Sequence, residues 1–156
     1  MGLRGVNRVM IAVHDIEKAK RQYSDLLGAT FTDADWTGEP FGINVSIAWD
    51  AGIELCAPMA GRENDSAVSQ FLALRGEGVM NVFFGVDDGD AASERASAHG
   101  YGCVNALDYT QKEIDQHLGG LFARYQEFTL DSGGRCGFAV TLARIDEKCL
   151  SPATPS

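Results

Sequence analysis

The chain contains two similar stretches of sequence, residues 6–28 and 79–100, at a constant offset. Each opens with an alternating apolar run, reaches an aspartate, continues into an alanine-containing amphipathic segment and ends at glycine. Asp15 and Asp88 occupy equivalent positions in the two stretches. An internal repeat predicts that the chain folds as two copies of one supersecondary unit, which need each other to bury their apolar faces.

The predicted unit is a strand, a helix and three further strands. In the first copy, Asp15 is a suitable N-cap and Gly28 a suitable C-terminal stop for the helix between them. The predicted strands cover residues 9–13, 30–37, 43–49, 53–57, 82–86, 103–106, 125–130 and 137–144. The fold class is therefore α+β, with paired βαβββ repeats whose sheets carry helices on the convex side and leave an open concave cup.

At 156 residues the chain has the length of one domain. We expect a single domain over residues 1–145, made of modules at 6–58 and 79–145 that are linked by a short helix at 66–74. Residues 146–156 are polar, contain two prolines and are expected to form a flexible tail. Residues 108–124 are longer than a connecting loop requires, and their apolar spacing predicts a helical insertion over one face.

Composition excludes several function classes. A formal net charge of −9 argues against nucleic acid, because phosphate binding needs a basic surface. No apolar run reaches the length of about 20 residues that a membrane span needs, and the N-terminus lacks a secretory pattern. The four cysteines show no CxxC spacing. We expect a cytoplasmic protein that binds neither nucleic acid nor membranes.

Four short segments carry a resemblance to a known superfamily. They are IAVHDIEKA at 11–19, the YxxxLG pattern at 23–28, IELCAP at 53–58 and FGVDD at 84–88. They resemble the vicinal oxygen chelate superfamily, which includes glyoxalases, bleomycin resistance proteins and dioxygenases, over roughly residues 6–145. The stretch 54–88 looks most like the methylmalonyl-CoA epimerase branch. The resemblance implies a paired βαβββ fold and a small-molecule site in the cup.

The resemblance also implies a divalent metal in the cup, held by histidines and acidic or amide side chains. The positions that match those ligands in this chain are Arg8, Glu54, Asn81 and Thr141. Arginine stays protonated and cannot ligate a metal, and the neutral oxygens of Asn81 and Thr141 are weak ligands for a transition metal. The histidines show no HxH or HExxH spacing. We therefore predict that the metal site is lost and that no cofactor is bound.

The residues that replace the metal site have two interpretations. In the first, Glu54 is a general base, Arg8 anchors a carboxylate, phosphate or thioester oxygen, and Asn81 donates a hydrogen bond to an enolate oxygen. In the second, Arg8 and Glu54 form a salt bridge that fills the space of the lost metal. Both interpretations apply, one after the other, if Glu54 pairs with Arg8 in the free protein and a substrate then displaces it.

Strand alternation selects the other side chains that we expect to line the cup. On the third strand we place Ser46 on the concave face and Val45 on the helix side. Aromatic residues near the rim are expected to stack on a ligand. The predicted ligand-contacting residues are Thr141, Met10, Ser46, Cys56, Phe83, Trp49 and His117.

The resulting hypothesis is a metal-independent isomerase or lyase that acts next to a carbonyl of a carboxylate or acyl-thioester substrate. One alternative is a non-catalytic protein of the drug-resistance type that sequesters a ligand. A second is a metal-dependent enzyme similar to methylmalonyl-CoA epimerase or glyoxalase. We expect a homodimer, because paired βαβββ units leave long sheet edges to cover. Whether the two modules pair within one chain or by exchange between two chains stays open at this stage.

Overall fold

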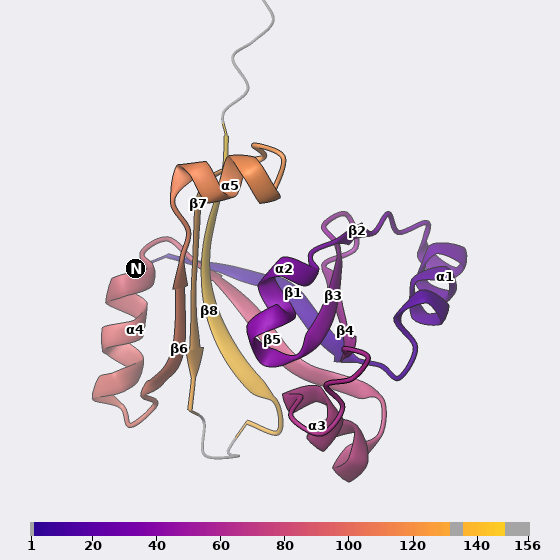
Figure 1. Cartoon of the computed structure of the whole chain (residues 1–156). Helices are drawn as coiled ribbons and strands as arrows, with labels where there is room; N and C mark the ends of the chain where they lie inside the picture. The colour runs from indigo at the N-terminus through magenta and orange to yellow at the C-terminus, as the bar shows by residue number, and fades with distance from the viewer. Residues whose placement is uncertain (1, 132–135, 149–156) are drawn as a thin grey trace, which may run out of the picture.

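The computed structural model describes residues 2–131 and 136–148, and within them eight strands form one sheet (Figure 1). The strands are β1 (Leu3–Ala12), β2 (Thr32–Asp33), β3 (Ile43–Ala48), β4 (Ile53–Pro58), β5 (Gly78–Val86), β6 (Cys103–Asp108), β7 (Phe122–Leu130) and β8 (Ala139–Glu147). The helices are α1 (Ile16–Leu27), α2 (Asp35–Gly38), the 3-10 turn η1 (Glu39–Phe41), α3 (Ala67–Arg75), α4 (Gly89–Ala98) and α5 (Gln111–His117).

The strand order shows the internal repeat directly. The order is β2-β3-β4-β1-β5-β8-β7-β6. Counted outward from the centre, the first module contributes β1, β4, β3 and β2, and the second contributes the equivalent strands β5, β8, β7 and β6. β1 runs parallel to β4, β5 runs parallel to β8, and β1 and β5 join the modules as an antiparallel pair. The predicted α+β fold is confirmed, and the two modules pair within one chain.

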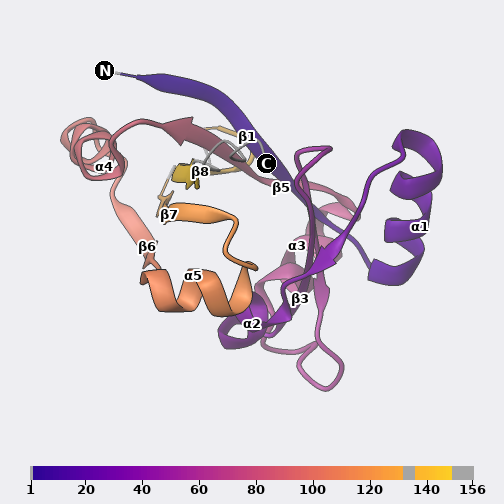
Figure 2. The same ribbon diagram turned by 90° about the horizontal axis from the view of Figure 1, so that it is seen from above.

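The two repeated aspartates have the same structural role. Asp15 Oδ1 accepts a hydrogen bond from the Lys18 backbone N–H at 3.0 Å, and Asp88 Oδ1 accepts one from the Ala91 N–H at 3.1 Å. Each caps the helix that follows the first strand of its module. The helices α1 and α4 lie at opposite ends of the curled sheet, on its outer side (Figure 2).

The pairing of the central strands β1 and β5 contains three register shifts, two with the extra residue in β1 and one with the extra residue in β5. One of the two in β1 lies between Val6 and Arg8, which leaves Asn7 as the extra residue. The equivalent extra residue in β5 is Met80. A bulge breaks the alternation of faces and re-aims a side chain. As a result, Asn7 projects beside Arg8 instead of on the opposite face.

Several segments differ from their sequence predictions; β1, for example, begins at Leu3 and not at residue 9. The strand predicted over 30–37 is reduced to β2, because Asp35 accepts a hydrogen bond from the Val45 backbone N–H at 2.9 Å and the chain turns into α2. The last strand runs longer than predicted, and β8 includes Asp146 and Glu147, the first two residues of the predicted tail. The rest of that predicted tail, apart from Lys148, lies outside the described residues.

The prediction for the two faces of β3 is wrong. Val45 pairs with Cys56 and belongs to the core cluster that fills the concave side, together with Val68 of α3. Ser46 lies on the opposite face, where its hydroxyl donates to Asp33, 2.9 Å away, which is held in turn by Lys20 of α1. The apolar side chains of β3 face the cup because α2 and α3 cover that side and bury them.

The cup itself is covered and not open. Trp36 of α2 packs against the concave core cluster, and Ile114 of α5 packs with Phe122 and Tyr125 at the other end of the cup. Figure 2 shows α2 and α5 next to each other over the space between the two halves of the sheet. Within the predicted helical insertion at 108–124 only residues 111–117 form a helix, α5, which contributes to this cover, and residues from 122 onward belong to β7. Among the described residues, every helix is too short or too polar to cross a lipid bilayer.

Candidate active site

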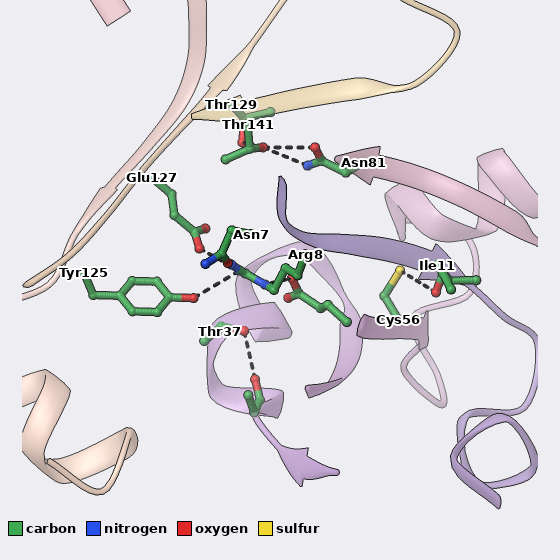
Figure 3. Close-up of polar contacts among 12 residues, drawn as sticks. Asn7, Arg8, Ile11, Thr37, Cys56, Asn81, Tyr125, Glu127, Thr129 and Thr141 are labelled. Carbon is green, nitrogen blue, oxygen red and sulfur yellow. Dashed lines mark hydrogen bonds and ion pairs between the residues drawn. The ribbon is translucent and has the colours of Figure 1, made fainter. Parts of the chain in front are cut away.

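Arg8 lies at the centre of the cup and joins side chains from both modules (Figure 3). Its Nε donates a hydrogen bond to Glu54 Oε2 of β4 at 2.9 Å. Its Nη2 donates to Glu127 Oε1 at 2.6 Å and to the Tyr125 hydroxyl at 3.1 Å, both on β7. Only 2% of Arg8 is exposed, so these contacts replace the water that a guanidinium would otherwise hold.

Two aromatic rings enclose the guanidinium. Arg8 Cζ lies 3.8 Å from the ring centroid of Phe83, its register partner on β5, and 5.1 Å from that of Trp49. A cation over an aromatic face is attracted by the ring quadrupole, more strongly when it is desolvated. The carboxylates and the rings together hold Arg8 in one conformation.

The charges in the cluster do not balance. Among the described residues of this cluster, Arg8 is the one cation, and it pairs with two carboxylates, Glu54 and Glu127. Burial raises the pKa of the Glu54 carboxyl, the Arg8 charge offsets part of this rise, and the Glu127 charge adds to it, so the net shift is upward. Burial alone lowers the pKa of Arg8, but the charges of Glu54, Tyr125 and Glu127 raise it well above its ordinary value. The guanidinium is therefore charged at every working pH.

Tyr125 and Cys56 stay neutral in this environment. Burial raises the pKa of the Tyr125 hydroxyl, and although Arg8 lowers it, the neighbouring carboxylates bring it well above its ordinary value. Burial and the Glu54 charge raise the pKa of the Cys56 thiol. A thiol with a raised pKa is a weak nucleophile, so the chemistry of this site is that of the carboxylates.

A second polar cluster lies beside the first and is separate from it. Asn81 Nδ2 donates to Thr141 Oγ1 at 2.9 Å, and the Thr141 hydroxyl in turn lies 3.1 Å from Asn81 Oδ1. Thr141 Oγ1 also lies 3.0 Å from Thr129 Oγ1. Figure 3 shows this group on β5, β7 and β8, apart from the Arg8 contacts.

The cover over the cup is a chain of aromatic side chains from both modules. Trp36 of α2 stacks on His117 of α5 with a centroid distance of 4.3 Å and an interplanar angle of 21°. Trp36 also lies 5.1 Å from Tyr109, which lies 5.4 Å from Tyr125. The Trp36 Nε1 donor is buried and has no hydrogen-bond partner among the described residues.

The structure brings together some of the predicted site residues. Arg8 and Glu54 form the predicted salt bridge, and Phe83 and Trp49 contact the guanidinium. His117 contacts Trp36 in the cover and not Arg8. The remaining predicted residues lie elsewhere: Asn81 and Thr141 in their own cluster, Met10 and Cys56 against the concave core, and Ser46 on the opposite face.

Three contributors to the cluster were missed from the sequence: Asn7, Tyr125 and Glu127. The sequence placed Tyr125 and Glu127 on one face of a predicted strand, which is only part of the signal needed to assign them to the site. What the sequence did not show was that β7 faces Arg8 across the cup. Asn7 was hidden by the bulge, since simple alternation puts it on the opposite face from Arg8.

The residues in the cup do not fit a divalent metal. The Arg8 guanidinium lies between Glu54 and Glu127 and hydrogen-bonds to both, so a cation is already present where a second one would have to bind. Asn81 and Thr141 are engaged with each other. Among the described residues there is no group of three or more His, Cys, Asp and Glu side chains that could hold a metal ion.

The comparisons with known proteins define the class of this protein. A sequence profile of the glyoxalase/bleomycin resistance protein/dioxygenase superfamily matches residues 7–117, well over half of the chain. The chain therefore belongs to this superfamily. No curated protein sequence matches it.

Solved structures with the same fold include several methylmalonyl-CoA epimerases. The enzyme from Mycobacterium tuberculosis has a TM-score of 0.68 and 23% identity, with 94% of this chain and 90% of that chain covered. An epimerase in complex with methylmalonyl-CoA and NH4+ has a TM-score of 0.69 and 22% identity over 99% of both chains. A hypothetical protein from Bacillus halodurans C-125 has a TM-score of 0.71 and 17% identity, with 94% and 97% covered. At these identities the likeness shows the fold.

Proposed function

We propose that this protein is a metal-independent isomerase or lyase that moves a proton next to the carbonyl of a carboxylate or acyl-thioester substrate. The observation that carries the proposal is the buried Arg8 between Glu54 and Glu127. An enolate needs a cation or strong donors at its oxygen and a base at its α-carbon. Arg8 supplies the cation and Glu54 supplies the base, and both belong to one desolvated cluster.

The proton transfer follows from the geometry of the pair. A substrate carbonyl oxygen takes the place of Glu54 on the Nε–H of Arg8, which frees the Glu54 carboxylate. Glu54 then removes the α-proton, and the electron pair of the C–H bond moves into the carbonyl to give an enolate whose oxygen Arg8 stabilises. In an isomerase the proton returns to carbon; in a lyase the enolate collapses and expels a group from the neighbouring carbon. The raised pKa of Glu54 brings it closer to the range in which a carboxyl both takes and returns a proton at neutral pH.

The structural neighbours support an acyl thioester as the substrate class. One was solved with methylmalonyl-CoA, and a variant of the Streptomyces coelicolor epimerase with 2-nitronate-propionyl-CoA. The role proposed for Asn81 as an additional enolate donor requires its amide to leave Thr141 during the reaction.

A ligand-sequestering protein remains the alternative function. Arg8, Glu54, Tyr125 and Glu127 are all less than a tenth exposed and satisfy one another, which is also what a purely structural ion cluster would show. The metal-dependent epimerase or glyoxalase alternative is disfavoured by the position of the Arg8 guanidinium between the carboxylates.

The decisive experiment measures α-proton exchange in D2O by NMR, with propionyl-CoA and methylmalonyl-CoA as substrates and EDTA present. We expect exchange with the wild type, loss of exchange in Glu54→Gln, and no change in the matched variant Glu94→Gln, which replaces an exposed residue of α4. Exchange that persists in Glu54→Gln, or appears only when a divalent metal is added, would overturn the proposal. Binding of either thioester without exchange would favour the sequestering function.

We also propose that the protein is a cytoplasmic homodimer. Leu3 and Val6 are 80% and 58% exposed on the first half of β1, where β4 does not pair with the strand. Exposed apolar side chains beside an unpaired strand edge favour association with a second copy. Light scattering after size-exclusion chromatography tests this: we expect a dimer that Leu3→Lys weakens, and a monomeric wild type would contradict it.

A further inference from the structure

A cavity of 570 Å³ lies between α4 and the outer face of the sheet, on the side away from the cup. Leu142 of β8 is part of its wall and follows Thr141, which hydrogen-bonds to Asn81 inside the cup, so alternation along β8 turns Leu142 outward. The volume lies in the range of about 300–1,000 Å³ that small-molecule sites have. The lining is mainly apolar and includes Leu3, Val86, Ala92, Ala96 and Leu142.

The internal repeat explains why this cavity opens behind α4. Counted from their capping aspartates, Tyr23 of α1 and Ala96 of α4 occupy the same helix position. Tyr23 packs against the core cluster beneath α1, which also contains Ala19, only 4% exposed. In the second module the equivalent Ala92 is only partly buried, and Gly89 is the one buried residue of α4. A methyl group in place of a phenol ring leaves the space between helix and sheet unfilled in the second module.

Both ends of α4 are held in place, so the helix cannot close the cavity by moving onto the sheet. Its first turn already touches β7: a Cβ added to Gly89 would lie 2.9 Å from Phe128 Cε2, and Asp90 Oδ1 accepts a hydrogen bond from Gln126 Nε2 at 3.3 Å. At the other end, the Tyr101 backbone N–H donates to Ala96 O at 2.9 Å, and Tyr101 lines the cavity.

One end of the cavity carries positive charge. Arg95 and His99 both line it, and they lie one helical turn apart on the same side of α4. No described residue pairs with the Arg95 guanidinium. The chain has a formal net charge of −9, so an unpaired arginine at an apolar cavity is a local exception to its acidity. A guanidinium binds a carboxylate through two parallel hydrogen bonds, and the charge of this end is therefore complementary to that of a carboxylate.

The opposite end of the cavity carries negative charge. Asp88 lines it there, and its Oδ1 accepts the capping hydrogen bond from the Ala91 N–H at 3.1 Å. The helix separates Asp88 from His99 by about 16 Å. An anionic head group is therefore favoured beside Arg95 and His99, and the apolar walls between the two ends fit an apolar chain.

We propose that the cavity between α4 and the outer face of the sheet binds an apolar monocarboxylate of the medium-chain fatty acid type, with its carboxylate on Arg95 and its chain against Val86 and Leu142. This site is separate from the cup, and ligand binding there does not depend on the proposed isomerase or lyase activity. The protein then has two sites on opposite faces of one sheet.

Three probes test the chemistry of the ligand. Octanoate has both the charge and the apolar chain, butyrate has the charge with a shorter chain, and octanol has the chain without the charge. Binding is measured by isothermal titration calorimetry and by saturation-transfer NMR on the probe. We expect saturable binding of octanoate and at least about tenfold weaker binding of butyrate and octanol. No saturable binding of octanoate, or equal binding of octanol, would overturn the proposal.

Ala96→Tyr tests the cavity itself. It installs the ring that α1 has at the equivalent Tyr23, and we expect it to fill the space and abolish the saturable binding of octanoate. Ala98→Tyr adds the same ring at an exposed position of α4 outside the cavity and should bind octanoate as the wild type does. Circular dichroism checks that both variants fold. Full octanoate binding by a folded Ala96→Tyr would place the ligand elsewhere and overturn the proposal.

Arg95→Gln tests the charge without changing the contact between α4 and the sheet, since Arg95 is exposed and the equivalent residue of α1 is Gln22. We expect octanoate binding to weaken about tenfold and octanol binding to stay the same. Arg21→Gln removes the same charge from an exposed position of α1 and is the matched control. Unchanged octanoate binding in Arg95→Gln would contradict the proposed position of the carboxylate.

Two further measurements separate this site from the other proposals. Glu54→Gln should bind octanoate as the wild type does, because Glu54 does not line the cavity; loss of binding in this variant would place the ligand in the cup. If octanoate binds but no α-proton exchange is seen, this site stands and the proposed reaction fails. Leu3 also belongs to the proposed dimer contact, so light scattering accompanies the titrations. A wild type that binds no octanoate, together with an Ala96→Tyr variant of altered oligomeric state, would assign the cavity to a second copy and overturn the proposal.

Discussion

Arg8 Nη2 of β1 lies 2.6 Å from Glu127 Oε1 of β7, which makes a buried ion pair between the first strand of one module and the third strand of the other. Arg8 also pairs with Glu54 of its own module at 2.9 Å. A single guanidinium thus holds the two halves of the cup together electrostatically, at the position where the superfamily resemblance implies a metal ligand.

The stability of the protein depends on this cation. Arg8→Met leaves the Glu54 and Glu127 carboxylates buried without a partner, and we expect it to lower the free energy of unfolding by about 3–5 kcal/mol. Urea unfolding followed by circular dichroism measures this change. Adding Glu54→Gln and Glu127→Gln to Arg8→Met removes both charges and should restore most of the loss. An Arg8→Met variant as stable as the wild type would show that the cluster contributes nothing.

The raised pKa of Glu54 predicts a particular pH dependence. The folded state binds the Glu54 proton more tightly than the unfolded chain, in which the pKa of a glutamate is about 4.3. As the pH rises from about 4.3 through the raised pKa, the contribution of Glu54 to stability therefore falls, and above the raised pKa it is constant. Glu54→Gln does not titrate. The free energy of unfolding of the wild type relative to Glu54→Gln should therefore decrease across that window in urea titrations at several pH values; a relative increase would contradict the direction of the shift.

The two helix caps should be energetically equivalent. Asp15→Ala and Asp88→Ala each remove one side-chain acceptor from a helix N-terminus, and we expect each to cost about 1 kcal/mol of unfolding free energy. Asp25→Ala, at an exposed position later in α1, is the control and should cost much less. Thermal unfolding of the three variants compares them. A large difference between the losses of unfolding free energy in Asp15→Ala and Asp88→Ala would contradict the expected equivalence of the two caps.

The aromatic cover should respond to the removal of one ring. His117→Ala removes the ring that stacks on Trp36 at 4.3 Å, and we expect a loss of about 0.5–1.5 kcal/mol in unfolding free energy. Trp36 should also become more accessible, because its indole loses one covering face. Acrylamide quenching of tryptophan fluorescence, compared with His99→Ala at the exposed C-cap of α4, measures that accessibility. Equal quenching in both variants would show that His117 does not cover Trp36.

The fold could be predicted from the sequence because its signals are local and repeated. Asp15 and Asp88 mark the two helix starts, and the alternating runs before them mark the first strand of each module. The face of β3 was mispredicted because alternation shows only that Val45 and Ser46 lie on opposite faces, not which of the two faces points into the cup. That choice is made by α2 and α3, which cover the concave side.

The candidate site was predictable only in part. The Arg8–Glu54 pair followed from the superfamily resemblance and is confirmed as a salt bridge. Glu127 and Tyr125 could not be assigned, since their approach to Arg8 depends on the curl of the whole sheet and not on any local pattern. Asn7 depended on a one-residue register shift between two strands distant in sequence. Both are long-range features that periodicity does not encode.

The central claim is that a guanidinium, and not a divalent metal, supplies the positive charge in the cup. Elemental analysis of the purified, untagged protein, followed by thermal unfolding with zinc, manganese, cobalt and nickel, tests it most directly. We predict no stoichiometric metal and no rise in Tm that saturates at one metal per chain. Stoichiometric metal, or a saturating rise that Glu54→Gln abolishes, would contradict the claim and restore a metal-dependent epimerase or glyoxalase as the better account.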